Sequence, residues 1–182
     1  MADQRIQYTE EIVGANHATK TDTLNRLTLI EHNNDGTHKN IPLLTNAESV
    51  LSAQFAVTGS AGTYQDTGLS ILLPAAGTYL FYGNVSSQIN MTVGTFAYIV
   101  TKLYNSTLVA DVANSERQGA YTYGTSLGYV LESSSQSQVI SVTAASTINL
   151  HAKRDGTYTT LIQSTVDSSS QGRTMLGYIR IG

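Results

Sequence analysis

Apolar and polar residues alternate with a period of two from residue 52 to the end of the chain. Successive side chains of a β-strand point to opposite faces, so this period predicts strands with one buried face. The predicted strands are residues 52–58, 67–73, 77–89, 96–105, 107–113, 125–132, 138–143, 147–154 and 174–182. Turn-forming stretches separate them, including PAAG, RDGT and the serine run SSSQSQ. Many short strands at regular spacing predict an all-β, antiparallel sandwich or barrel.

A different period precedes these strands, at residues 21–36. Leu24, Leu27 and Ile30 recur every three residues behind Asp22, a residue that suits a helix N-cap. A helix of about three turns is too short to be stable alone. Its apolar stripe is therefore expected to pack against a second or third copy of itself.

The change of period divides the chain into two parts. Residues 1–45 are predicted to form an N-terminal stalk or attachment segment with a short helix, and residues 46–182 a β head domain. Upstream of the helix, the sequence does not distinguish between strand, helix and extended arm.

The composition of the chain excludes several kinds of site and partner. Charged residues make up only 13% of the 182 residues, the net charge is −3, and there is no cysteine. The absence of cysteine excludes a disulfide scaffold and a thiolate metal site. The absence of a basic cluster argues against nucleic acid as a partner. No run of 18 apolar residues exists, so membrane insertion is not expected.

The histidines are better explained by structure than by metal binding. His32 and His38 flank the turn NNDG, six residues apart, which is not a standard ligand spacing. Three copies around an axis would bring three of each together, so ions on such an axis stay an open alternative. We interpret the stretch 31–40 as a hinge between a helical stalk and a β head.

Catalytic motifs are equally sparse. His151 is the only histidine after residue 38, and no Gly-x-Ser-x-Gly elbow accompanies the many serines. The carboxylates of the β region are scattered, as Asp66, Asp111, Glu116, Glu132, Asp155 and Asp167. We therefore expect no enzyme activity, catalytic residue, metal site or cofactor. Carboxylates paired only in space would leave a glycan-cleaving enzyme as an alternative.

Tyrosine is the remaining signal, with 11 Tyr against 3 Phe and no Trp. A tyrosine ring combines apolar area and a hydroxyl at little entropic cost, so it is common on recognition surfaces. The stretch 114–125 is expected to be a loop carrying Arg117, Tyr121 and Tyr123, and a second loop carries Asp155 and Tyr158. These five residues are the candidate receptor-binding residues. The alternative is that their rings pack in strands or interfaces.

The stretch ILLPAAGTYLFYGNVSSQI, residues 71–89, carries a family resemblance. It resembles the tumour-necrosis-factor and complement globular-head superfamily, in which a Pro-x-x-Gly turn precedes a Gly-x-Tyr-x-Phe strand. Pro74, Gly77, Tyr79 and Phe81 fill those places. The closing GRTMLGYIRIG and the central YIVTKLYNSTLV are similar to strands of the same family. The resemblance covers about residues 50–182 and implies an antiparallel jelly-roll sandwich.

The same strand carries large apolar groups on both faces. Tyr79 and Phe81 share one face, and Leu80 and Tyr82 share the other. A strand exposed to water on one face would not have this pattern. The resemblance implies a homotrimer with Leu80 and Tyr82 near the threefold axis. The apolar stripe of the predicted helix adds Leu24 and Leu27 to the expected trimer interface. The alternative is a monomeric sandwich with Tyr82 half-buried.

The N-terminal part resembles a different group of proteins. In VGANHATKTDTLNRLTLIEHNNDGTHKN, the matching residues are Asn16, His17, 23–27 and 32–38. Over these 28 residues the chain is similar to segments ahead of the distal domains of phage and prophage tail-fibre proteins. The resemblance implies a bacteriophage virion component, exposed extracellularly on a tail fibre or surface appendage, which contacts other tail or baseplate proteins through residues 1–45.

Together these observations favour a virion structural and receptor-binding protein, a tail-fibre or spike tip that attaches to a bacterial surface polysaccharide. One alternative is a purely architectural fibre cap, baseplate or capsid decoration protein without a receptor. A second is a glycan depolymerase. The host, the receptor and the position on the particle do not follow from the sequence.

Overall fold

The computed structural model describes residues 45–124, 128–169 and 172–182. They belong to one compact unit, Leu44–Gly182. The predicted stalk helix, with Leu24 and Leu27, and the turn between His32 and His38 lie outside the described residues. The division near residue 45 into stalk and head stays a prediction.

Every regular element within the described residues is a β-strand, and every strand pair is antiparallel. The strands are β1 (Asn46–Val50), β2 (Phe55–Ala56), β3 (Gln65–Leu73), β4 (Gly77–Asn105), β5 (Ala110–Asp111), β6 (Arg117–Tyr123), β7 (Gly128–Val142), β8 (Ser146–Val166), β9 (Ser168–Ser169), β10 (Gly172–Arg173) and β11 (Met175–Arg180). The all-β antiparallel fold class predicted from the sequence is confirmed.

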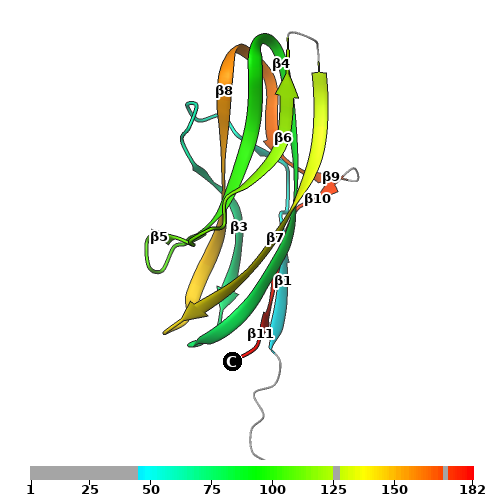
Figure 1. Cartoon of the computed structure of the whole chain (residues 1–182). Helices are drawn as coiled ribbons and strands as arrows, with labels where there is room; N and C mark the ends of the chain where they lie inside the picture. Colours follow the sequence, from blue (N-terminus) through cyan, green and yellow to red (C-terminus); the bar gives the residue numbers. More distant parts are fainter. Residues whose placement is uncertain (1–44, 125–127, 170–171) are drawn as a thin grey trace, which may run out of the picture. The chain divides into compact units, whose positions relative to one another are not determined.

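Two very long strands, β4 and β8, fold the sheet into two layers. Both bend over at the same end of the domain (Figure 1). The first part of β4 pairs with β11 and β7, and its second part pairs with β8 and β6. The first layer therefore contains β1, β11, the first part of β4 and β7. The second layer contains β3, the first part of β8, the second part of β4 and β6. Two layers of four antiparallel strands are the arrangement of a jelly roll.

Glycine allows β4 and β8 to lie close together where they bend. The pairing register shifts several times between Asn90 and Phe96. A Cβ on Gly94 would lie 2.7 Å from the Tyr158 Cα, and a Cβ on Gly156 would lie 2.4 Å from the Phe96 carbonyl oxygen. Gly156 also has a φ of 135°, which favours glycine. The RDGT stretch, expected to be a turn, is instead a bend inside β8.

The core lies between the layers and follows the predicted alternation along β4. Tyr79, Phe81 and Val85 are fully buried among aliphatic residues of both layers. The Tyr79 ring meets Tyr178 edge to face at 5.1 Å, and its hydroxyl donates to the Ala75 carbonyl oxygen at 2.8 Å. Tyr79 therefore connects the core to the predicted Pro74–Gly77 turn, which ends β3 and begins β4.

Three predicted loops are strands in the structure. The serine run belongs to β7, whose residues 128–142 pair without interruption with β4. The stretch after Arg154 continues as β8 to Val166, and most of the expected loop 114–125 is β6. Ser, Gln and Gly have weak strand propensity, but pairing with the long, apolar β4 overrides it.

Truncating the Phe81 ring should strongly destabilise the domain. Phe81→Ala is expected to lower the free energy of unfolding by about 3–5 kcal/mol, because the residue is fully buried. Urea unfolding followed by circular dichroism measures the change, with Leu108→Ala at a 63% exposed position as the control. A loss below about 1 kcal/mol for Phe81→Ala would contradict this description of the core.

Candidate binding surface

The outward face of the second layer brings together aromatic side chains from β4 and β6. Tyr98 on β4 pairs with Tyr121 on β6 and, on its other side, with Asp155 on β8. Phe96 pairs in the same way with Tyr123. Partners in register project from the same face of a sheet. Phe96, Tyr98, Tyr121 and Tyr123, here called the aromatic row, therefore lie side by side.

The rings of the aromatic row are ordered against one another and still reach solvent. Phe96 and Tyr98 are nearly parallel, at 8°, with centroids 6.0 Å apart. The Tyr98 and Tyr121 centroids are 6.4 Å apart. Tyr121 is 38% exposed and Tyr123 is 72% exposed. The second-layer face thus offers ring faces held by strands, which is the kind of surface on which a sugar ring can stack.

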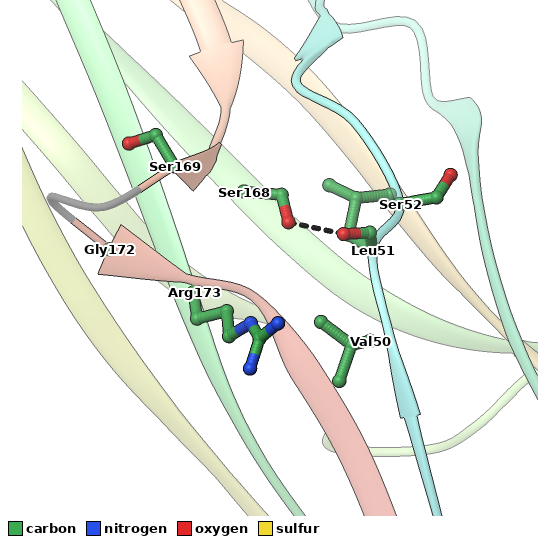
Figure 2. A pocket seen from close by; sticks show the side chains of 7 residues that line it. All are labelled: Val50, Leu51, Ser52, Ser168, Ser169, Gly172 and Arg173. Atoms are coloured by element: carbon green, nitrogen blue, oxygen red, sulfur yellow. Dashed lines mark hydrogen bonds between the residues drawn. The ribbon is translucent and has the colours of Figure 1, made fainter.

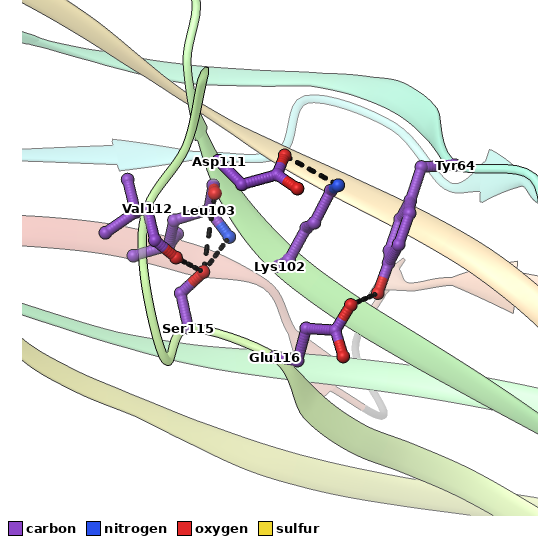
Figure 3. Close-up of polar contacts among 7 residues, drawn as sticks. All are labelled: Tyr64, Lys102, Leu103, Asp111, Val112, Ser115 and Glu116. Atoms are coloured by element: carbon purple, nitrogen blue, oxygen red, sulfur yellow. Dashed lines mark hydrogen bonds and ion pairs between the residues drawn. The ribbon is translucent and has the colours of Figure 1, made fainter.

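A charged cluster adjoins the aromatic row, centred on Tyr64, which precedes β3. Figure 3 shows the Tyr64 hydroxyl directed at Glu116 and Lys102 lying between Asp111 and the Tyr64 ring. The hydroxyl donates to Glu116 Oε1 at 2.6 Å. Lys102 Nζ lies 2.6 Å from Asp111 Oδ1 and 4.0 Å from the Tyr64 ring centroid. Lys153 Nζ lies 4.6 Å from the same centroid.

Tyr64 crosses the second layer from one edge to the other. It precedes β3 at one edge, and Glu116 immediately precedes β6 at the opposite edge. Partial burial, and then the hydrogen bond to Glu116, raise the pKa of Tyr64 far above that of a free tyrosine. The hydroxyl therefore stays protonated and remains a donor. This contact ties the loop before β6 to the far side of the sheet.

The side chains of Ser115 and Arg117 hold the segment that leads into β6. Ser115 Oγ donates to the Val112 carbonyl at 2.6 Å and accepts from the Leu103 amide at 3.0 Å. The Arg117 guanidinium donates to the Asn114 and Glu116 carbonyls at 2.9 and 2.7 Å. Arg117 thus fixes the entry to β6 through its own Nη1. The residues from Asp111 to Arg117, with Lys102, line an open pocket of about 530 Å³.

His151 lies on the same face, stacked on Tyr104 at 4.5 Å between ring centroids. Burial is the largest influence on it and lowers the pKa of His151 below 6.5. Asp66 on β3 and Asp111 raise that pKa, while Lys102 on β4 lowers it. The imidazole is therefore neutral at pH 7.

His151 should make the domain sensitive to mild acid. Because its pKa is lower in the folded protein than in the unfolded one, stability is lost as the pH falls from about 6.5 through the folded-state pKa. His151→Gln should lose less stability than the natural protein between pH 7 and pH 5. Thermal unfolding of both proteins across this range measures the difference. Parallel curves would show that His151 does not contribute.

The structure brings some of the predicted receptor-binding residues together and separates one. Tyr121, Tyr123 and Asp155 share the second-layer face, with Arg117 at its edge. Tyr158 does not join them, because its ring packs against the buried cluster of Ile89, Met91, Ala97, Ile99 and Ala120. We therefore leave Tyr158 out of the candidate surface.

Several residues of this surface were not predicted from the sequence. Phe96, Tyr98, Lys102 and Tyr104 occupy alternate positions of FAYIVTKLY, so they share one face of β4. This alternation could have predicted from the sequence that the four side chains share one face. Tyr64 and Lys153 gave no comparable signal, because they meet only through the pairing of β3 with β8 and of β8 with β4.

The outward face of the first layer has a different chemistry. Leu80 pairs with Ile179 on β11 and with Val139 on β7, which makes an apolar row across three strands. Leu80 is 37% exposed and Val139 is 58% exposed. Val50, also exposed, lies on the same face of the neighbouring β1, four residues along the strand from Asn46, the partner of Ile179. We call Val50, Leu80, Val139 and Ile179 the apolar patch.

Tyr82 borders the apolar patch and is half-buried within its own subunit. A Cβ on Gly177 would lie 2.5 Å from the Tyr82 ring, so the ring lies against that glycine. The Tyr82 hydroxyl donates to Glu48 Oε1 at 2.9 Å, and this hydrogen bond raises the pKa of Tyr82. The predicted trimer contacts Leu80 and Tyr82 therefore lie on one surface, both reaching solvent in the single chain.

A second open pocket lies near β1 and the β9–β10 pair (Figure 2). Val50, Leu51, Ser52, Ser168, Ser169, Gly172 and Arg173 line it. Ser168 Oγ donates to the Leu51 carbonyl, which joins its two sides. The described residues include no group of three or more His, Asp or Glu side chains placed to hold a metal ion. Across the same residues there is no helix of the length and apolarity that crossing a membrane requires.

Comparison with known proteins gives weak likenesses only. No protein-family model matches the chain, and no curated protein matches it. The structure of Eiger TNF from S. frugiperda is similar with a TM-score of 0.46 and 10% identity, over 76% of this chain and 93% of that one. The structure of the infectious bursal disease virus Gt strain is similar with a TM-score of 0.45 and 13% identity, over 78% of this chain and 38% of that one.

Proposed function

We propose that this protein is a homotrimeric virion component of a bacteriophage, a tail-fibre or spike tip that attaches to a glycan on the bacterial surface. The aromatic row carries this proposal. Its rings are held by β4 and β6, reach solvent, and share their face with the Asp155 carboxylate and the Lys153 ammonium group. A sugar needs such a combination, because its ring face stacks on aromatic rings while its hydroxyls need hydrogen-bond partners.

The apolar patch supports self-association. Leu80 and Val139 are adjacent and exposed in the single chain, and Val50 is exposed further along the same face. Adjacent exposed apolar side chains such as Leu80 and Val139 are typical of protein interfaces. Three copies joined through this patch would keep their second layers free. Three weak glycan sites on one rigid head would then bind a polymer with high apparent affinity.

The placement on a virion is supported by sequence alone. Residues 13–40 resemble segments of phage tail-fibre proteins, and we propose that residues 1–45 bind other tail or baseplate proteins. This part of the proposal can be tested apart from glycan binding. Mass spectrometry of purified virions should detect the protein among structural components, and its absence from every particle would contradict the proposal.

The glycan-binding function can be tested with the full chain fused to a fluorescent protein. The fusion should label cells of a susceptible strain within a panel of bacterial isolates, and purified surface polysaccharide from that strain should compete. Incubation with the protein should leave the chain length of the polysaccharide unchanged. A shortened polymer would instead support a depolymerase. A failure to bind any strain would leave a purely architectural protein as the better account.

A further inference from the structure

Lys153 is the one side-chain cation of the second-layer face without an oxygen partner among the described residues. Lys102 is paired with Asp111, and Arg117 donates to two carbonyls. The Lys153 ammonium instead lies 4.6 Å from the centre of the Tyr64 ring. A cation against a ring face is held in position while its hydrogen-bonding capacity stays free.

The carboxylates around Lys153 already accept hydrogen bonds or ion pairs from other groups. Asp155 Oδ1 accepts from the Gly156 amide at 2.8 Å, and Glu116 Oε1 accepts from the Tyr64 hydroxyl at 2.6 Å. Asp111 is paired with Lys102 at 2.6 Å. A ligand that covered Lys153 without offering an anion or an acceptor would leave a desolvated charge, which is costly.

The strand register places Lys153 within reach of a sugar stacked on the aromatic row. Lys153 pairs with Val100, and Tyr98 lies two residues before Val100 on the same face of β4. Two residues along a strand correspond to about 7 Å. Asp155, the next residue on this face of β8, pairs with Tyr98 itself. A substituent on a sugar stacked against Tyr98 and Tyr121 can therefore meet the ammonium.

We infer that the glycan is anionic, and that a carboxylate or phosphate substituent binds Lys153 while a sugar ring stacks on the aromatic row. This inference rests on the proposed function and names the chemical class of the ligand. Tyr64 is a positioning residue in it, because its ring orients the ammonium. The alternative sources of the anion are uronic or other acidic sugars and phosphodiester-linked glycans.

The test uses surface polysaccharide purified from a strain that the fluorescent fusion labels. Three forms of the polysaccharide are compared: native, carboxyl-reduced to the neutral sugar, and dephosphorylated. One of the two treatments should weaken binding of the full-length protein at least about tenfold, which also identifies the anion. The affinity of Lys153→Gln for the native polymer should be lower than that of the natural protein by a similar factor. On the polymer that has lost its anion, the two proteins should bind equally. Lys153→Arg should retain binding.

Three results would overturn the inference. Binding that survives both treatments would show that the ligand is neutral at this site. Native binding by Lys153→Gln equal to that of the natural protein would show that the ammonium is not used. In both of these cases the proposed function would still stand if Tyr121 and Tyr123 were required. A fusion that labels no strain would overturn the proposed function together with the inference.

Discussion

Replacement of both Tyr121 and Tyr123 by alanine is expected to abolish attachment to host cells and to leave the fold intact. Both rings belong to the aromatic row, and each offers solvent a face that no other part of the described domain covers completely. Loss of an aromatic anchor from a binding site typically costs at least about tenfold in affinity. Three sites on one head would magnify the effect, because avidity depends on every single-site affinity.

The stability of this double variant should change little. Tyr123 is 72% exposed, and surface substitutions generally change the free energy of unfolding by about 0.5 kcal/mol or less. Tyr121 loses one ring contact with Tyr98, at 6.4 Å between centroids. Attachment is measured by fluorescence of labelled cells, and stability by thermal unfolding of the same preparation.

A matched control separates loss of the site from loss of exposed apolar area. Leu108 and Val109 are 63% and 75% exposed and lie outside the aromatic row, so Leu108→Ala with Val109→Ala should attach normally. Unchanged attachment by the tyrosine variant would move the binding site away from β6. Lost attachment together with a clearly lower melting temperature would show that the rings serve packing.

The second large effect concerns assembly, and we expect Leu80→Asp to convert a trimer into monomers. In the single chain Leu80 is 37% exposed, so an aspartate there costs little in the isolated domain. At a threefold interface the same change would bury three carboxylates near one another. An unpaired buried charge costs several kcal/mol, so three of them should outweigh the favourable free energy of association at this interface. Tyr82→Asp should also weaken the trimer, because it replaces the ring that borders the apolar patch with a carboxylate.

Light scattering measures this outcome directly. The natural protein should have three times the chain mass of 19.5 kDa at micromolar concentration, and Leu80→Asp should have the mass of one folded chain. Leu72→Asp is the matched control, because Leu72 is 56% exposed on β3 in the second layer. A natural protein that is monomeric would contradict the proposed assembly, as would a Leu80→Asp variant that remains trimeric.

The fold class followed from the sequence because alternation along β4 is strong. Tyr79, Phe81 and Val85 lie in the core as the period of two predicts, and the turn before Gly77 begins β4 at the expected residue. The lengths of β4 and β8 could not be predicted from the sequence pattern. Gly94 and Gly156 would usually indicate turns, but here they allow β4 and β8 to stay paired through a bend. Local signals cannot distinguish a bend from a chain reversal when the partner strand is distant in sequence.

The candidate binding surface could be predicted from the sequence only in part. Tyr121 and Tyr123 were noticed because tyrosine is frequent in this chain, yet their stretch was predicted to be a loop and is the strand β6. Asp155 was predicted to lie in a separate loop, whereas in the structure it pairs with Tyr98, which also pairs with Tyr121. Tyr64 reaches Glu116 over a separation of 52 residues, so only the folded chain reveals that contact.

The most direct test of glycan binding at the aromatic row is hydroxyl-radical footprinting of the full chain, with and without polysaccharide from a strain that it labels. Tyr121 and Tyr123 should be protected from oxidation when the polysaccharide is bound, while exposed Ile162 on the last part of β8 should oxidise equally in both samples. Protection confined to residues outside the second-layer face, with Tyr121 and Tyr123 oxidised as in the free protein, would contradict the account.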